Sequence, residues 1–141
     1  MTRRRHACAI VLFVAVSVIA TWRSSASVLD GQVRERDPDW TAPADATSKP
    51  NPLAGRSDAE AGGRKLFQER CTSCHGEDGR GTSKGPNLTD VGVQAQSDGA
   101  LFWKMTTGNS REGMPTFSFL PALQRWQLVL RLRSLATDSN R

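Results

Sequence analysis

The chain of 141 residues is predicted to be all-α, with about three main helices joined by long loops. Residues that start and end helices flank three stretches within residues 57–137, and no stretch shows the sustained alternation of a β-strand. The intervening loops are long and rich in glycine for a folded part of about 80 residues. A chain of that size with so much irregular structure needs something bulky to pack around.

Capping residues indicate where each helix begins and ends. The first helix is predicted from Ser57, whose hydroxyl can cap it with Glu60 at the third helical position. The second follows Ser97 as its cap and ends at Gly108. The third begins at Pro121, because proline is favoured at the first helical position. One face of this third helix is an apolar stripe formed by Leu128, Leu132 and Leu135.

An apolar run follows a cluster of arginines at the N-terminus. Residues 1–6 read MTRRRH, residues 7–20 are uncharged and mostly apolar, and small residues follow at 24–28. This is the layout of a secretory signal peptide, with cleavage expected after Ala26 or Ser27. The run as far as Trp22 would form a helix of about 24 Å, shorter than the ~30 Å hydrocarbon core of a membrane. Residues 1–27 are therefore interpreted as a signal peptide, with an uncleaved N-terminal anchor as the alternative.

Residues 28–56 have the composition of a flexible linker. Four of the seven prolines lie there, among Asp, Ser, Thr, Ala and Gly, and no helical or strand period is visible. Such a segment buries too little apolar surface to offset its ordering entropy. The folded domain is accordingly predicted at residues 57–137, with a short C-terminal tail at 138–141.

The charge of the chain does not indicate a nucleic-acid partner. The formal net charge is +5, but four of the arginines lie in the first 23 residues. Residues 28–141 contain 15 Lys and Arg against 14 Asp and Glu, a net charge of +1. No basic patch of the kind that binds phosphates is therefore present in the mature sequence.

The pentapeptide CTSCH contains the most informative residues of the chain: Cys71, Cys74 and His75. A structural zinc site needs four ligands, and the other histidine and cysteine both lie in the leader. A thioredoxin-like redox pair requires a strand–loop–helix context, which is not visible. The third interpretation is the C-x-x-C-H site of a c-type haem. Two thiols three residues apart lie on one side of a helical turn, where each can form a thioether with a haem vinyl group.

The same motif places a histidine ring directly beside the attached porphyrin, so His75 is predicted to bind the iron. No second histidine remains in the exported part, and a methionine thioether is the usual alternative. Met114 is the stronger candidate, because Gly113 and Pro115 shape a loop around it. Met105 lies within a helical pattern, where methionine is more often a core residue. An open or water-filled sixth position is the remaining alternative.

From about Ser57 to Ala136 the sequence resembles the class I monohaem cytochromes c of bacterial periplasms. Four segments carry the resemblance in the expected order: GRKLFQERCTSCHG, GPNLTDV, EGMPTF and WQLVLRLRSL. The resemblance implies a cytochrome c fold, whose helices and long loops surround one covalently attached haem c. It also implies a location in the periplasm, with a tether to the inner membrane through the leader as an alternative.

The resemblance further assigns roles around the haem. Gly63 and Phe67 would lie where the first helix crosses the last, and the Pro86 carbonyl would accept a hydrogen bond from His75 Nδ1. The family often has an aromatic residue where this chain has Arg131, so Arg131 is expected to reach solvent or a haem propionate. The residues implied to line the haem pocket are Phe67, Pro86, Leu88 and Phe117.

The residues argue for electron transfer rather than bond-making catalysis. No nucleophile–base pair is readable, so the protein is not expected to be an enzyme. The leading hypothesis is a periplasmic one-electron carrier between redox protein partners, with His/Met ligation of one haem iron. Two alternatives remain: a haem-bearing subunit of a periplasmic dehydrogenase or oxidoreductase, and a haem-based sensor with an open sixth position.

Overall fold

The structure, a computed structural model, describes residues 37 and 39–138. The predicted signal peptide or anchor at 1–27 and residues 139–141 of the predicted tail lie outside the described residues. The described part is helical, and its only β-type pairing is an isolated bridge between Asn109 and Met114. This confirms the predicted all-α class.

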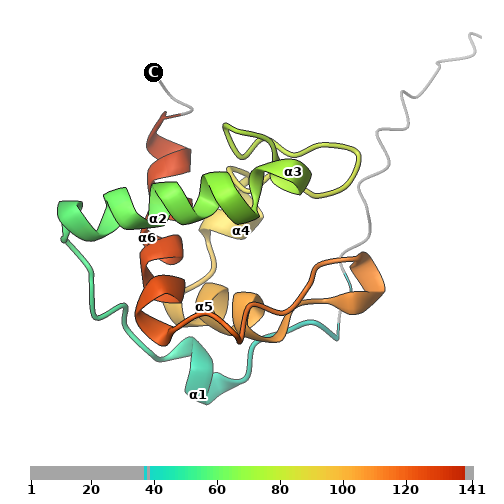
Figure 1. The fold of residues 1–141 in the computed structure, drawn as a ribbon. Coiled ribbons are helices and arrows are strands. Elements are labelled where there is room, and N and C mark those ends of the chain that lie inside the picture. The colour runs from blue at the N-terminus through green and yellow to red at the C-terminus, as the bar shows by residue number, and fades with distance from the viewer. Residues whose placement is uncertain (1–36, 38, 139–141) are drawn as a thin grey trace, which may run out of the picture. The chain divides into compact units, whose positions relative to one another are not determined.

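Three main helices form the framework of the domain (Figure 1): α2 (Ser57–Arg70), α5 (Asp98–Thr107) and α6 (Ala122–Asp138). They correspond to the three helices predicted from the sequence. Four single turns complete the described elements: α1 (Ala44–Thr47), α3 (Thr72–His75), α4 (Val91–Gln94) and the 3-10 turn η1 (Ser110–Glu112).

The capping predictions have different outcomes at the three helices. Ser97 caps α5 as expected, because its hydroxyl accepts a hydrogen bond from Ala100 N at 3.1 Å, and Gly108 ends that helix. At α2 the expected capping box is absent: the N-cap residue is Arg56, and no side chain caps it. The Glu60 carboxylate instead accepts a hydrogen bond from Ser134 in α6. The last helix begins at Ala122, one residue later than predicted.

The crossing of α2 over α6 is the centre of the fold (Figure 1). At Gly63 the two backbones touch, because a Cβ at this position would overlap the carbonyl oxygen of Gln127. Phe67, on the next turn of α2, is 1% exposed and belongs to the core with the apolar stripe of α6. The expectation that Gly63 and Phe67 lie at this crossing therefore agrees with the contacts.

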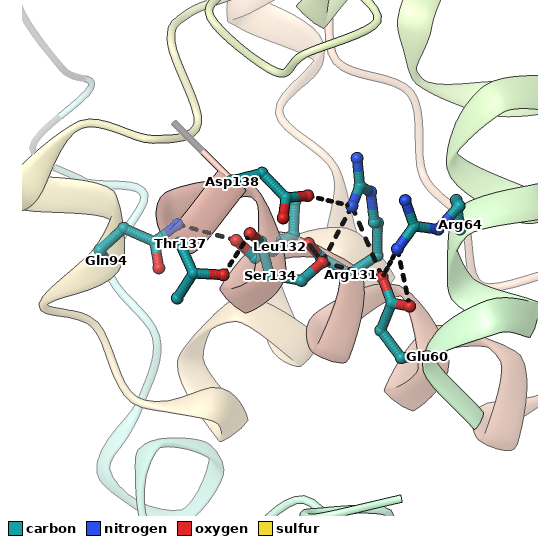
Figure 2. A network of polar contacts seen from close by, with 8 residues as sticks. All are labelled: Glu60, Arg64, Gln94, Arg131, Leu132, Ser134, Thr137 and Asp138. Carbon is teal, nitrogen blue, oxygen red and sulfur yellow. Dashed lines mark hydrogen bonds and ion pairs between the residues drawn. The ribbon is translucent and has the colours of Figure 1, made fainter. Parts of the chain in front are cut away.

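Arg131 is buried, which corrects the expectation that it reaches solvent. Its side chain is only 8% exposed, and Nη1 lies 2.9 Å from Asp138 Oδ2 and 3.5 Å from Glu60 Oε1. Figure 2 shows this network, in which Ser134 donates a further hydrogen bond to Glu60. The guanidinium carbon also lies 5.9 Å from the centre of the Phe67 ring. A cation–π contact thus replaces the aromatic pair that the family resemblance implies.

The described part of the predicted linker packs against the domain. We call residues 37 and 39–56 the N-terminal segment. Its helix α1 lies against α5 so closely that a Cβ at Gly99 would overlap the Ala46 carbonyl. Leu53 belongs to the core, and Asn51 Nδ2 donates to the Trp126 carbonyl at 3.2 Å. The structure therefore moves the start of the folded unit N-terminal to the predicted Ser57.

Candidate haem-binding site

The CTSCH pentapeptide continues directly from α2. Cys71 N donates to Phe67 O at 2.8 Å, which closes the last turn of that helix. His75 N then donates to Cys71 O at 2.9 Å, so the motif winds into the single turn α3. This places two free, partly buried thiols three residues apart on one helical turn, with the histidine beside the second. The geometry is the one that the haem interpretation requires.

The thiol of Cys71 is held in its protonated form. Burial, and to a smaller extent the neighbouring Cys74, raises the pKa of Cys71 to about 12. Among residues 37 and 39–138, moreover, no group of three or more His, Cys, Asp or Glu side chains could bind a metal ion.

The ring of His75 is oriented by one backbone carbonyl. Its Nδ1 lies 2.9 Å from Pro86 O, and because a carbonyl can only accept, Nδ1 must carry the proton. The lone pair of the ring is then on Nε2, on the other side of the imidazole. Burial lowers the pKa of His75, although the bond to Pro86 acts in the opposite direction. The imidazole is therefore neutral at neutral pH, as an iron ligand must be.

A tightly bonded loop places the Pro86 carbonyl beside the histidine. Gly81 N donates to His75 O at 2.8 Å, and the Thr82 hydroxyl donates to Cys74 O at 2.6 Å. Gly85 fits against the motif, since a Cβ there would lie 2.8 Å from Cys74 O and 3.1 Å from His75 Cε1. Only glycine therefore allows the loop to approach the haem motif this closely.

Met114 lies in a second closed loop, residues 109–114, which we call the methionine loop. Asn109 and Met114 exchange two backbone hydrogen bonds, each of 2.9 Å, and η1 lies between them. Gly113 adopts a left-handed conformation with φ of 79°, which returns the chain to Asn109. The Met114 side chain is partly buried and packs against the core. Met105 is instead buried within α5, as expected of a core methionine.

The other residues implied to line the haem pocket divide into two groups. Phe67 and Phe117 are both buried in the core that α2, α5 and α6 share. Leu88 is only partly buried at the edge of that core, two residues after the Pro86 carbonyl that fixes His75.

Asn109 is a residue beside Met114 that the sequence did not predict. The only local signal for it was a capping-type residue directly after a helix-ending glycine.

The chemistry of these residues fits a c-type haem. Two thiols on one turn can bond to two vinyl groups, and the adjacent imidazole presents an unprotonated nitrogen. Among the described residues, no helix is long and apolar enough to span a membrane.

Comparisons with known proteins point to the same group. A family model described as "Cytochrome C oxidase, cbb3-type, subunit III" matches residues 58–130. Among solved structures, the chain is similar to cytochrome CL from the marine methylotrophic bacterium Methylophaga aminisulfidivorans, with 26% identity and a TM-score of 0.53. That match covers 60% of this chain and 60% of the other. No curated protein matches the chain.

The matched family region begins at the first turn of α2 and includes the CTSCH motif, the Pro86 loop and the methionine loop. The fold, the donor set and both comparisons agree. The chain therefore belongs to this family of c-type cytochromes, electron-transfer proteins of the class I monohaem type that carry a covalently attached haem c.

Proposed function

We propose that this cytochrome is a periplasmic one-electron carrier whose haem iron is bound by His75 and Met114. Cys71 and Cys74 are the residues that would form the two thioethers. The observation that carries the proposal is the hydrogen bond of 2.9 Å between His75 Nδ1 and Pro86 O, which leaves Nε2 for the iron. The methionine loop supports Met114 as the second ligand. The loop closes at Met114 itself, and the side chain of this residue is partly buried.

The residues of the chain have separate tasks in this function. The haem supplies the one-electron chemistry, as its iron alternates between the ferric and ferrous states. Pro86 orients the His75 ring and increases its basicity as a ligand. The soft sulfur of Met114 would favour the ferrous state and so raise the reduction potential. The packed core of α2, α5 and α6 excludes water from the side chains behind the site.

The location rests on the leader. Its arginines, apolar run and small residues favour export, and a cytochrome c with both thiols bonded to haem suits an oxidising compartment. An intact mass of the purified protein tests this, because it reports both the number of attached haems and whether the leader is removed. A mass that retains residues 1–27 would support the membrane tether instead.

Replacement of the two methionines tests the proposed ligation. In Met114→Leu we expect loss of the methionine–iron charge-transfer band of the ferric protein and appearance of a high-spin haem, since leucine has no sulfur ligand. The matched control is Met105→Leu, a volume-conserving change in the core that should leave the band in place. The wild-type ferrous protein should resist carbon monoxide. A Met114→Leu spectrum identical to the wild type would overturn the proposal.

A second candidate is a haem-bearing subunit with a fixed partner, such as a dehydrogenase or another oxidoreductase. The description of the matching family model, which names an oxidase subunit, favours this possibility. The net charge of +1 for residues 28–141 also gives little electrostatic attraction for a transient partner. Purification from the native membrane and periplasmic fractions distinguishes the carrier from the fixed subunit, because a fixed subunit co-elutes with its partner at high salt.

The third hypothesis, a haem sensor with an open sixth position, has a different spectrum. The wild-type haem would then be high-spin and would respond to carbon monoxide.

A further inference from the structure

The N-terminal segment reaches the methionine loop although it lies outside the region that the family model matches. The contact is made by Asp37, whose side chain is 12% exposed. Its Oδ2 accepts a hydrogen bond of 3.3 Å from Asn109 Nδ2, across 72 positions of sequence. Arg111, also in the methionine loop, lies 4.0 Å from the other carboxylate oxygen.

Asn109 connects this contact to Met114. Its backbone exchanges both hydrogen bonds with Met114, and its side-chain oxygen accepts from Glu112 N at 3.4 Å. The residue is 6% exposed, so its amide group has little access to water as an alternative partner. The orientation of this one side chain therefore links Asp37 to the closed form of the methionine loop.

The N-terminal segment is itself held against the helices at several points. Ser97 Oγ donates to Thr47 O at 2.7 Å, and Asn51 bonds to α6. Lys104 Nζ lies 4.5 Å from the centre of the Trp40 ring. Close to the contact, Asp39 N donates to Asp37 Oδ1 at 3.1 Å, so both carboxylate oxygens have protein donors.

We propose that Asp37 is a positioning residue for the sixth iron ligand: through Asn109 it stabilises the closed methionine loop and so keeps Met114 on the iron. This inference rests on the proposed His75/Met114 ligation. Loss of the Asp37 contact would raise the fraction of molecules in which Met114 has left the iron. The apparent affinity of an external ligand for the ferric haem rises in proportion to that fraction.

The test is a titration of the ferric holoprotein with imidazole, which competes with Met114 for the iron. Asp37→Ala should bind imidazole about tenfold more tightly than the wild type, the lower end of the effect of removing one hydrogen bond to a charged acceptor. Asp37→Asn keeps an oxygen that can accept from Asn109, so its affinity should lie near that of the wild type. Asp39→Ala is the matched control, because it removes an exposed carboxylate that lies 3.5 Å from Arg111 but keeps the backbone N–H that donates to Asp37.

A double variant locates the effect. If Asp37 acts through Asn109, Asp37→Ala combined with Asn109→Ala should bind imidazole no more tightly than Asn109→Ala alone. Additive effects of the two changes would overturn the proposed route. Equal tightening in Asp37→Ala and Asp39→Ala would overturn it as well, because the effect would then come from the charge near Arg111.

The outcome also separates this inference from the proposed function. If Met114→Leu leaves the spectrum unchanged, the ligation itself is wrong. If Met114→Leu removes the charge-transfer band but Asp37→Ala binds imidazole like the wild type, only the role of Asp37 is wrong. Circular dichroism of Asp37→Ala should match the wild type, which excludes general unfolding as the cause of tighter binding.

Discussion

Arg131 shows how a charged residue occupies a position between two packed helices. Its guanidinium is neutralised by Glu60 and Asp138, and the Ser134 hydroxyl hydrogen-bonds to both Arg131 and Glu60 (Figure 2). A buried charge without such partners would be strongly destabilising. The sequence could not reveal this network, because Glu60 also fits the local pattern of a helix cap. The Glu60 carboxylate could either cap its own helix or pair with the buried Arg131. In the structure it pairs with Arg131.

This network makes stability depend on pH through Glu60. Burial alone would raise its pKa, but hydrogen bonds from Ser134 and Arg64, and the charges of Arg64 and Arg131, lower it overall. A pKa lowered by folding means that the ionised form stabilises the folded state. The contribution is complete above the ordinary pKa of about 4.3 and is lost as the pH falls through the lower folded value.

Glu60→Gln should therefore reduce the free energy of unfolding by about 1 kcal/mol at pH 7, the usual value for one charge-assisted contact in a partly exposed network. The difference from the wild type should shrink toward pH 3, as measured by denaturant unfolding across the pH range. Glu69→Gln, a change at an exposed position of the same helix, is the control. A difference independent of pH would contradict this account.

At the scale of elements, the crossing of α2 and α6 depends on a pair of neighbouring glycines with different surroundings. Gly63 touches the backbone of α6 at Gln127, whereas a Cβ at Gly62 would meet only the Gln127 side chain. A backbone carbonyl cannot move without shifting the helix, but a glutamine side chain can rotate away.

Gly63→Ala should consequently lower the free energy of unfolding by about 2 kcal/mol, since overpacking at the crossing exceeds the gain in helix propensity. Gly62→Ala should change it by less than about 0.5 kcal/mol, because the propensity gain and the displaced side chain offset each other. Thermal unfolding of both holoproteins provides the comparison. Equal effects of the two substitutions would show that the backbone contact at Gly63 is not the determining one.

The helices could be predicted from the sequence because their signals are local. The apolar stripe of α6, the Ser97 cap and Gly108 each act within one or two turns. The contiguous CTSCH motif could be recognised for the same reason. The hydrogen bond between Asp37 and Asn109 had no such signal, since it joins two polar residues in different parts of the chain. The His75–Pro86 bond was expected only through the family resemblance.

At the scale of the whole molecule, the N-terminal segment extends the domain beyond its predicted boundary. Its composition resembles that of a linker because most of its residues remain exposed after docking. Only a few side chains, among them Ala46, Asn51 and Leu53, are buried against the helices. The amino-acid composition of a segment is an average over all its residues. A linker predicted from composition can therefore still dock through a few buried side chains.

Leu53→Ala tests whether this docking contributes to the stability of the whole domain. We expect a loss of about 3 kcal/mol, typical for truncation of a buried leucine. Leu123→Ala is the matched control, because Leu123 is 55% exposed and its truncation should cost less than about 0.5 kcal/mol. The readout is guanidinium unfolding of the holoprotein. If the two variants unfold at the same denaturant concentration, the docking of the N-terminal segment does not contribute to the stability of the domain.

The base of the methionine loop has a consequence for engineering. Gly108 meets the backbone of Pro115 so closely that a Cβ would lie 2.6 Å from the Pro115 carbonyl carbon, and the Thr116 hydroxyl donates to Thr106 O at 2.6 Å. The two ends of the loop are thus held together by a close backbone contact and a hydrogen bond. Residues 110–112 can accordingly be exchanged as a cassette, while Gly113 is kept because its left-handed conformation closes the loop. A library confined to these three positions would vary the surroundings of Met114 and leave the helical scaffold unchanged.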